Sequence, residues 1–171
     1  RPYPLSINGD VNGDGYADML IGLSQSNGGL NLNGKAVLIF GKPNGSWASG
    51  SIDILKDIEF LSSDLTSVAL GYSVCILPDI NQDGFDEILI GSYDPAINKG
   101  GKAFLIYGRS DFTSFLNQSK QFDLAMADAS FMDSNESRGF SERVHPAGDL
   151  NNDGFQDFTV EKNFSIVLIG K

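Results

Sequence analysis

The chain has 171 residues, enough for one domain with a sizeable core, and 41% of them are apolar, as in ordinary globular proteins. Its 12 Lys and Arg residues stand against 22 Asp and Glu residues, which gives a net charge of −10. This acidity argues against nucleic acid or an anionic membrane surface as a partner and favours cations. No apolar run approaches the roughly 18 residues of a membrane helix.

The first part of the chain contains an acid-rich, glycine-broken loop that runs directly into an apolar segment. The loop reads GDVNGDGYAD (9–18) and is followed by MLIG. A Gly- and Asn-rich stretch at 28–35 is interpreted as a hairpin, and the apolar run AVLIF (36–40) comes next. Continuous runs of about five apolar residues between Gly, Asn and Lys are typical of strands covered on both faces.

The second part repeats this order with the loop PDINQDGFDE (78–87), which runs into ILIG. Its segment GKAFLIYGR (101–109) matches GKAVLIFGK (34–42) of the first part. The apolar segments here predict four strands, near 72–77, 87–91, 102–107 and, as the weakest, 129–133. Cys75 lies in the first of these strands and is expected to be a buried small hydrophobic residue. As the single cysteine, it excludes an internal disulfide.

The third part carries the loop GDLNNDGFQD (148–157), followed by FTV and then by FSIVLIGK (164–171). The sequence stops before a counterpart of the fourth strand. The loops recur 69 residues apart from Asp10 to Asp79 and 70 residues apart from Asp79 to Asp149. This period is long for a helical solenoid, and no segment shows a convincing 3.6-residue periodicity.

The repeats therefore predict an all-β fold made of β-propeller blades, each with four antiparallel strands. The expected blades span 1–69, 70–138 and 139–171, and the third is incomplete because it lacks its fourth strand. The chain would hold about two and a half to three blades of a partial propeller. Open blades leave apolar faces and sheet edges uncovered, so further blades or another chain are expected to complete the ring. The start at Arg1, without Met or a signal peptide, indicates a processed or trimmed piece of a longer protein.

The three loops share the chemistry of a calcium site. Counted from the first aspartate, each has an oxygen-bearing side chain at positions 1, 3, 5 and 9, and a glycine at position 6 that lets the position-7 carbonyl turn inward. Clustered carboxylates without a cation would repel one another. We expect one Ca²⁺ in each loop, held by Asp10, Asn12, Asp14, Tyr16 and Asp18; by Asp79, Asn81, Asp83, Phe85 and Glu87; and by Asp149, Asn151, Asp153, Phe155 and Asp157.

Other interpretations of the loops are weaker. Asn-Gly and Asp-Gly pairs also make ordinary hairpin turns, but a turn needs no acids at positions 1, 5 and 9. An EF-hand requires a Glu at position 12, where these loops have Ile or Val. Magnesium holds its water and prefers a rigid octahedron. In the second loop, Glu87 is longer than Asp, and neighbouring Asp86 competes with it as a candidate ligand.

The repeats resemble the FG-GAP repeat, which is known from the propeller of integrin α subunits. The matching stretches are LGYSV (70–74), DINQDGFDE (79–87) and ILIGSY (88–93). The first part matches as GDVNGDGYADMLIGLS (9–24) and the third as GFSERVHPAGDLNNDGFQDFTV (139–160), where the end of the pattern is replaced by VEKN. The resemblance implies a seven-bladed propeller with calcium between the first two strands of several blades. It also implies an extracellular or cell-surface protein that acts in adhesion or ligand binding. The Phe-Gly pair of the pattern is replaced by Leu70-Gly71 and Phe140-Ser141.

The remaining features favour a binding scaffold over an enzyme. His145, the one histidine, is expected to be structural or exposed, and the chain has no P-loop or GxSxG signature. The expected partner is a protein or glycan ligand on the loop face, where Trp47 is either an exposed contact or a packed anchor. The alternatives are a non-catalytic propeller module of a secreted polysaccharide- or lipid-acting enzyme and a structural unit of an extracellular filament or coat. The sequons predict N-glycosylation at Asn44, Asn117 and Asn135.

Overall fold

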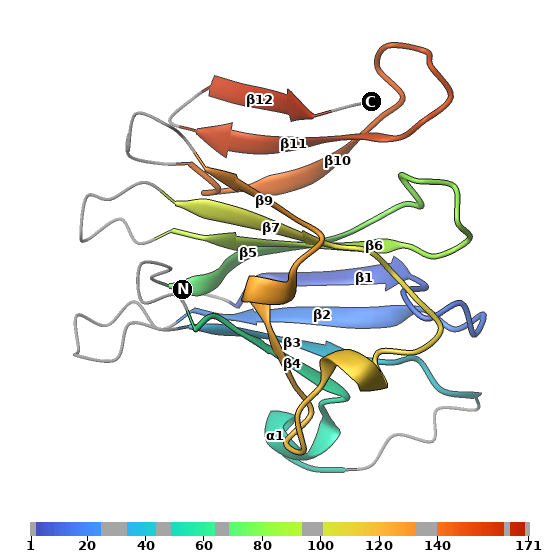
Figure 1. Cartoon of the computed structure of the whole chain (residues 1–171), viewed down its shortest axis with the longest axis vertical. Coiled ribbons are helices and arrows are strands. Elements are labelled where there is room, and N and C mark those ends of the chain that lie inside the picture. Colours follow the sequence, from blue (N-terminus) through green and yellow to red (C-terminus); the bar gives the residue numbers. More distant parts are fainter. Residues whose placement is uncertain are drawn as a thin grey trace.

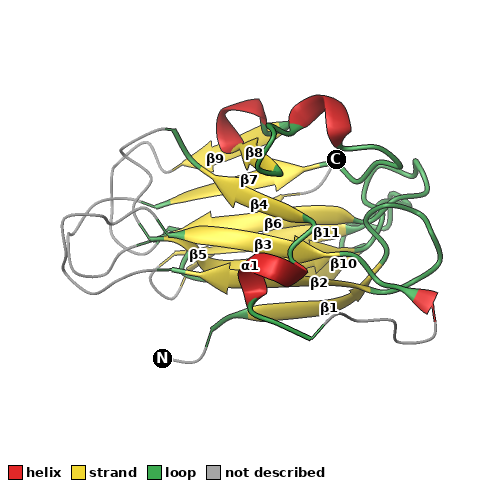
Figure 2. Ribbon diagram, turned by 90° about the horizontal axis from the view of Figure 1, so that it is seen from below, coloured by secondary structure: helices red, strands yellow, loops and turns green. Residues whose placement is uncertain are grey.

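The computed structural model describes residues 3–24, 34–43, 49–63, 69–93, 101–132, 140–162 and 165–169. Within these residues the chain forms three β-sheets that lie one above another, with a few short helices at the periphery (Figures 1 and 2). The sequence-based expectation of a mostly β fold is confirmed. The described strands make an open stack and no closed ring.

The first sheet has five strands in the order β1-β2-β3-β4-β8. The first four pair antiparallel, whereas β8 pairs parallel to β4 from a distant part of the chain. Strand β8 was not expected here, because it lies between the third and fourth strands of the second repeat. The strands of this sheet are β1 (Leu5–Gly9), β2 (Asp18–Leu23), β3 (Lys35–Ile39), β4 (Ile58–Leu61) and β8 (Gln121–Asp123).

The second sheet has four antiparallel strands in the order β5-β6-β7-β9, close to the positions predicted from the sequence. Its strands are β5 (Leu70–Leu77), β6 (Glu87–Ser92), β7 (Lys102–Ile106) and β9 (Ala129–Met132). The third sheet has three antiparallel strands. These are β10 (Val144–Gly148), β11 (Asp157–Lys162) and β12 (Ser165–Ile169).

Among the described residues, three short helices accompany the sheets, and none was predicted. Helix α1 (Ile52–Leu55) precedes β4, while the 3₁₀ helices η2 (Thr113–Phe115) and η3 (Leu124–Met126) flank β8. Arg109 fixes the segment around η2, since its guanidinium lies 4.3 Å from the centroid of the Phe115 ring and its Nη2 donates to Asp128 Oδ2 at 2.7 Å. This segment brings β8 to the edge of the first sheet (Figure 1).

Strands β5, β6 and β7 of the second sheet are buried on both faces, which explains their apolar runs. In β5, Val74 and Ile76 belong to the hydrophobic cluster shared with the first sheet, whereas Cys75 and Leu77 belong to the cluster shared with the third sheet. Successive side chains of a strand point to opposite faces, so a strand between two sheets is apolar along most of its length. Each fully buried aliphatic side chain contributes about 1.5–3 kcal/mol. The predicted burial of Cys75 is confirmed.

The outward face of the first sheet is less covered. Leu5 and Ile7 of β1 are 55% and 50% exposed, whereas Ser6 between them points inward, where its Oγ accepts a hydrogen bond from Ile76 N at 2.9 Å. Their counterparts one repeat later, Val74 and Ile76, are buried against the first sheet. The first sheet thus presents an apolar face whose equivalent in the second sheet is an internal interface.

Candidate metal centre

The three acid-rich loops occupy equivalent places in the three sheets. Each connects the first strand of its sheet to the second: β1 to β2, β5 to β6, and β10 to β11. All three connections lie along the same side of the stack (Figure 1). The sequence repeat therefore becomes a row of three similar loops at one rim of the molecule.

The loops also share one internal hydrogen-bond pattern. In the second loop, the Asp79 carboxylate accepts from Asp83 N at 3.1 Å and from Gly84 N at 2.8 Å, and Asp83 Oδ1 accepts from Phe85 N at 3.0 Å. The corresponding distances are 3.0, 2.8 and 2.9 Å in the first loop and 3.1, 2.9 and 2.9 Å in the third. The three loops therefore have closely similar curled backbones.

The glycine at position 6 of each loop has a left-handed backbone. The φ angles of Gly15, Gly84 and Gly154 are +85°, +93° and +92°, a region that residues with a Cβ rarely adopt. Position 4 is left-handed as well, including the non-glycine residues Gln82 and Asn152 at φ 62° and 58°. Two left-handed residues within three positions curl the chain tightly around the side chains of positions 1, 3 and 5.

The acid at position 9 differs from the other loop acids because it begins a strand and is buried. Asp18, Glu87 and Asp157 are only 1%, 0% and 5% exposed. One carboxylate oxygen of each accepts a hydrogen bond from the position-2 amide of the same loop, at 2.7, 2.7 and 2.8 Å. This bond closes the loop on itself.

The second oxygen of the position-9 acid separates the loops into two kinds. In the first loop, Asp18 Oδ1 accepts from Gly41 N at 2.8 Å. In the second and third loops, Glu87 Oε1 and Asp157 Oδ1 are buried and have no hydrogen-bond partner among the residues that the structure describes. A buried carboxylate oxygen without a partner is costly, and a bound cation would satisfy it.

The second loop brings its carboxylates closest together. One oxygen each from Asp79, Asp83 and Glu87 lie within 4.8 Å of one another, the single such group of three among the described residues. Burial, with the neighbouring charges of Asp79, Asp83 and Asp86, raises the pKa of Glu87 to about 8. Burial likewise raises the pKa of Asp18 to about 6. A cation bound in the second loop would attract the ionised carboxylate of Glu87 and so offset the cost of burying its charge.

The oxygen donors of the loops fit a hard cation. Carboxylates, an amide oxygen and a backbone carbonyl are the ligands that Ca²⁺ takes in flexible geometry. Asp79, Asn81, Asp83 and Glu87, with the carbonyl of Phe85, would hold the ion in the second loop. The third loop offers the same arrangement through Asp149, Asn151, Asp153, Phe155 and Asp157, and the first loop offers it through Asp10, Asn12, Asp14, Tyr16 and Asp18.

Asp86 has a different place from the one expected. It does not compete with Glu87, because its Oδ1 accepts from Asp79 N at 3.0 Å and its Oδ2 accepts from Asp10 N at 2.8 Å. The carboxylate therefore connects two loops. The sequence holds one indication of this different role: only the second loop has an acid at position 8, which is Ala17 in the first loop and Gln156 in the third.

Several other candidates lie away from the loops or outside the described residues. His145 is exposed, 56% by its side chain, with its Nε2 3.9 Å from Glu161 Oε1. Asn117 is also exposed, and its Oδ1 accepts from Ser119 N at 2.9 Å. Trp47, Asn44 and Asn135 lie outside the described residues. None of the helices in the described part is long and apolar enough to cross a membrane.

Comparison with known proteins places these observations in a family context. No family model matches the chain. Integrin alpha-7 of Rattus norvegicus is 30% identical over 108 residues, which cover 63% of this chain and 8% of that protein. Integrin alpha-8 of Gallus gallus is 26% identical over 168 residues, which cover 88% of this chain and 14% of that protein.

The chain is a distant homologue of part of the integrin α subunits. The predicted resemblance is thereby confirmed, and for integrin alpha-8 of Mus musculus the match extends over 91% of the chain. The chain spans no more than 15% of the length of these integrin α relatives.

Proposed function

We propose that the chain is part of a calcium-stabilised extracellular scaffold for binding or adhesion, of the integrin α propeller type, and not an enzyme. The observation that carries this proposal is the second loop, where Asp79, Asp83 and Glu87 each bring a carboxylate oxygen within 4.8 Å of the others. Glu87 also has a buried oxygen, Oε1, with no hydrogen-bond partner among the described residues. A divalent cation there would join the end of β5 to the start of β6. Similar ions in the first and third loops would stabilise the same rim of the other two sheets.

The test is a calcium titration of the EDTA-treated chain by calorimetry, with thermal unfolding recorded in parallel. We expect up to three sites and a melting temperature that rises with calcium, because a ligand that binds only the folded state stabilises it. Asp111→Asn, an exposed acid outside the loops, is the matched control and should leave both results unchanged. Absence of binding at millimolar calcium would refute the cation sites.

We also propose that the three sheets are propeller blades, divided at 1–69, 70–138 and 139–171, and that another sheet of the same repeat covers the outward face of the first. The support is the equivalence between exposed Leu5 and Ile7 and buried Val74 and Ile76. In the isolated chain, a second copy should substitute for that sheet. Light scattering should detect concentration-dependent association that Ile7→Lys weakens and Thr113→Lys, on an exposed residue elsewhere, does not. A chain that stays monomeric would contradict this part.

The ligand of the scaffold is proposed to be a protein or a glycan that meets the loop face. Its extracellular placement rests on the relation to integrin α subunits, and N-glycosylation is proposed at exposed Asn117 together with Asn44 and Asn135. Peptide mapping of the secreted protein, before and after enzymatic removal of glycans, would test these modifications. Saturable binding to glycan or protein arrays that requires calcium would support the adhesion role.

A further inference from the structure

We propose that Asp86 is a positioning residue that raises the cation affinity of the second loop by anchoring this loop to the first. The inference rests on the cation-binding function proposed above. Asp86 is at position 8, between the candidate ligands Phe85 and Glu87. Its two oxygens accept backbone amides, so it acts through the ligands and not as one of them.

Asp86 is anchored by three hydrogen bonds. Asp86 Oδ2 accepts from Asp10 N at 2.8 Å, and Asp86 N donates to Asp10 O at 3.1 Å, although the two residues are 76 positions apart. Asp86 Oδ1 accepts from Asp79 N at 3.0 Å. One carboxylate therefore holds the position-1 amides of two successive loops.

Asp79 is the residue through which the anchor reaches the cation site. Its carboxylate belongs to the converging triad and also accepts the amides of Asp83 and Gly84. Fixing the Asp79 backbone therefore fixes the base of the loop. Groups that hold metal ligands in place typically change metal affinity by roughly 10- to 100-fold when they are mutated.

A second contact between the loops supports the same role. A Cβ atom on Gly13 would lie 2.6 Å from the Phe85 ring, so the ring packs directly against the first loop. In addition, a Cβ on Gly108 would lie 2.3 Å from Asp86 O. Phe85 and Asp86, which directly precede Glu87, are thus both held against neighbouring backbone. The second loop is restrained by the first repeat as well as by its own hydrogen bonds.

The third loop provides an internal control. It has the same internal hydrogen bonds, and within the described part of the chain its buried position-9 oxygen, Asp157 Oδ1, has no partner. It carries Gln156 where the second loop carries Asp86, so position 8 there has no carboxylate to bridge two amides. The two loops differ at this position and at Glu87, and they touch where Gln82 Nε2 donates to Gly154 O at 2.8 Å.

The experiment measures the two loops separately in the whole chain. The amides of Gly84 and Gly154 each donate to the first aspartate of their own loop, at 2.8 and 2.9 Å, and their NMR signals report occupancy. In a calcium titration, Asp86→Asn should raise the midpoint for Gly84 by about tenfold or more and leave that for Gly154 unchanged. Asn keeps the shape of Asp but offers one acceptor oxygen in place of two. Gln156→Ala, the matched variant, should leave the Gly84 midpoint unchanged.

A second readout tests the route through Asp86. In a chain with Asp14→Ala, which removes a candidate ligand from the first loop, calcium entering the second loop should still shift the Asp10 amide signal. Adding Asp86→Asn should abolish this shift, because the hydrogen bond from Asp10 N is lost or weakened. If Asp86 only stabilised the fold, calcium binding in the second loop would not change the amide signal of Asp10 in the first loop.

The outcomes separate the inference from the function on which it rests. A Gly84 signal that does not respond to calcium in the native chain would overturn the cation site and this inference together. A responsive Gly84 with an unchanged midpoint in Asp86→Asn would overturn the inference alone, as would equal weakening of both loops. Asp86→Ala should give a larger effect, and if it does not fold, Asp86→Asn decides.

Discussion

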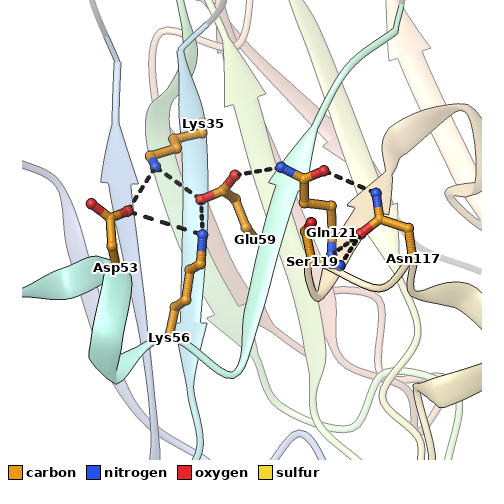
Figure 3. A network of polar contacts seen from close by, with 7 residues as sticks. All are labelled: Lys35, Asp53, Lys56, Glu59, Asn117, Ser119 and Gln121. Atoms are coloured by element: carbon orange, nitrogen blue, oxygen red, sulfur yellow. Dashed lines mark hydrogen bonds and ion pairs between the residues drawn. The ribbon is translucent and has the colours of Figure 1, made fainter.

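Gln121 Nε2 donates a hydrogen bond of 3.0 Å to Glu59 Oε1, across the parallel pair of β4 and β8 and over 62 residues of sequence. The other oxygen, Glu59 Oε2, accepts from Lys35 Nζ at 2.8 Å and Lys56 Nζ at 2.6 Å, as Figure 3 shows. Glu59 is 5% exposed, and these hydrogen bonds supply partners to both of its oxygens. This network fastens a strand of the second repeat to the edge of the first sheet.

Replacing Glu59 with Ala should destabilise the protein by roughly 2–3 kcal/mol, because two ammonium groups and an amide lose their partner. The side chains of Lys35 and Lys56 are 29% and 17% exposed and keep part of their hydration, so the loss of stability should be smaller than for a fully buried ion pair. Chemical denaturation measures this change in the free energy of unfolding. Asp53→Ala, at a residue whose side chain is 66% exposed, is the control and should cost less than about 0.5 kcal/mol. Equal losses in both variants would contradict the central role of Glu59.

Acid should weaken the same network. Burial opposes ionisation of Glu59, but hydrogen bonds from Lys35, Lys56 and Gln121 outweigh it and lower its pKa from 4.5 to about 2. Since the pKa is lowered in the folded state, the stabilisation is present above about pH 4.5 and is lost as the pH falls through about 2. Unfolding free energies measured from pH 5 to pH 2 should fall more steeply in the native chain than in Glu59→Gln.

Glu87 should produce the opposite pH dependence in the absence of calcium. Its pKa is raised from 4.5 to about 8, so the cation-free protein should lose stability as the pH rises between these values. Calcium should restore that stability, because the ion binds the charged carboxylate. Glu87→Gln should flatten the dependence and remove one calcium site from the titration. If calcium stabilises the native chain and Glu87→Gln equally at pH 8, Glu87 is not a ligand.

Gly71→Ala should be strongly destabilising, by more than about 2 kcal/mol. The glycine has φ +77°, and a Cβ there would lie 2.3 Å from the Lys35 backbone oxygen, which cannot move aside cheaply. Gly148→Ala is a matched control, because its φ is +76° but nothing lies within 4 Å of the new Cβ. It should cost only the backbone penalty of about 1 kcal/mol. Thermal denaturation of both variants measures the contribution of the contact.

Much of the fold followed from the sequence because its signals are local and repeated. The alternation of Val74, Cys75, Ile76 and Leu77 between two hydrophobic clusters needs only a strand covered on both faces. The loops were found because acids at fixed positions around a glycine, present in all three repeats, are typical of a cation site and exceed what a hairpin turn requires. Which loop gathers its acids most closely was not evident, since it depends on how the buried start of each following strand is placed.

The features that were missed depend on contacts distant in sequence. Strand β8 is only three residues long and is stabilised by Glu59 and by the ring contact of Phe60 with Phe122, whose centroids are 5.4 Å apart. No local sequence pattern predicts such a strand. Asp86 was placed among the possible ligands for the same reason, because its partner Asp10 is 76 residues away.

The parallel pairing of β4 with β8 also affects the order in which the molecule can form. During synthesis, β4 emerges long before its partner strand Gln121–Asp123. Until that strand is made, β4 is an exposed sheet edge that can pair with other chains. Closing so distant a contact slows folding, since the intervening chain must first be ordered. A polypeptide cut between the first and second repeats would keep that edge bare. The repeats visible in the sequence are therefore not separate folding units: the first sheet is completed only after most of the second repeat has been made.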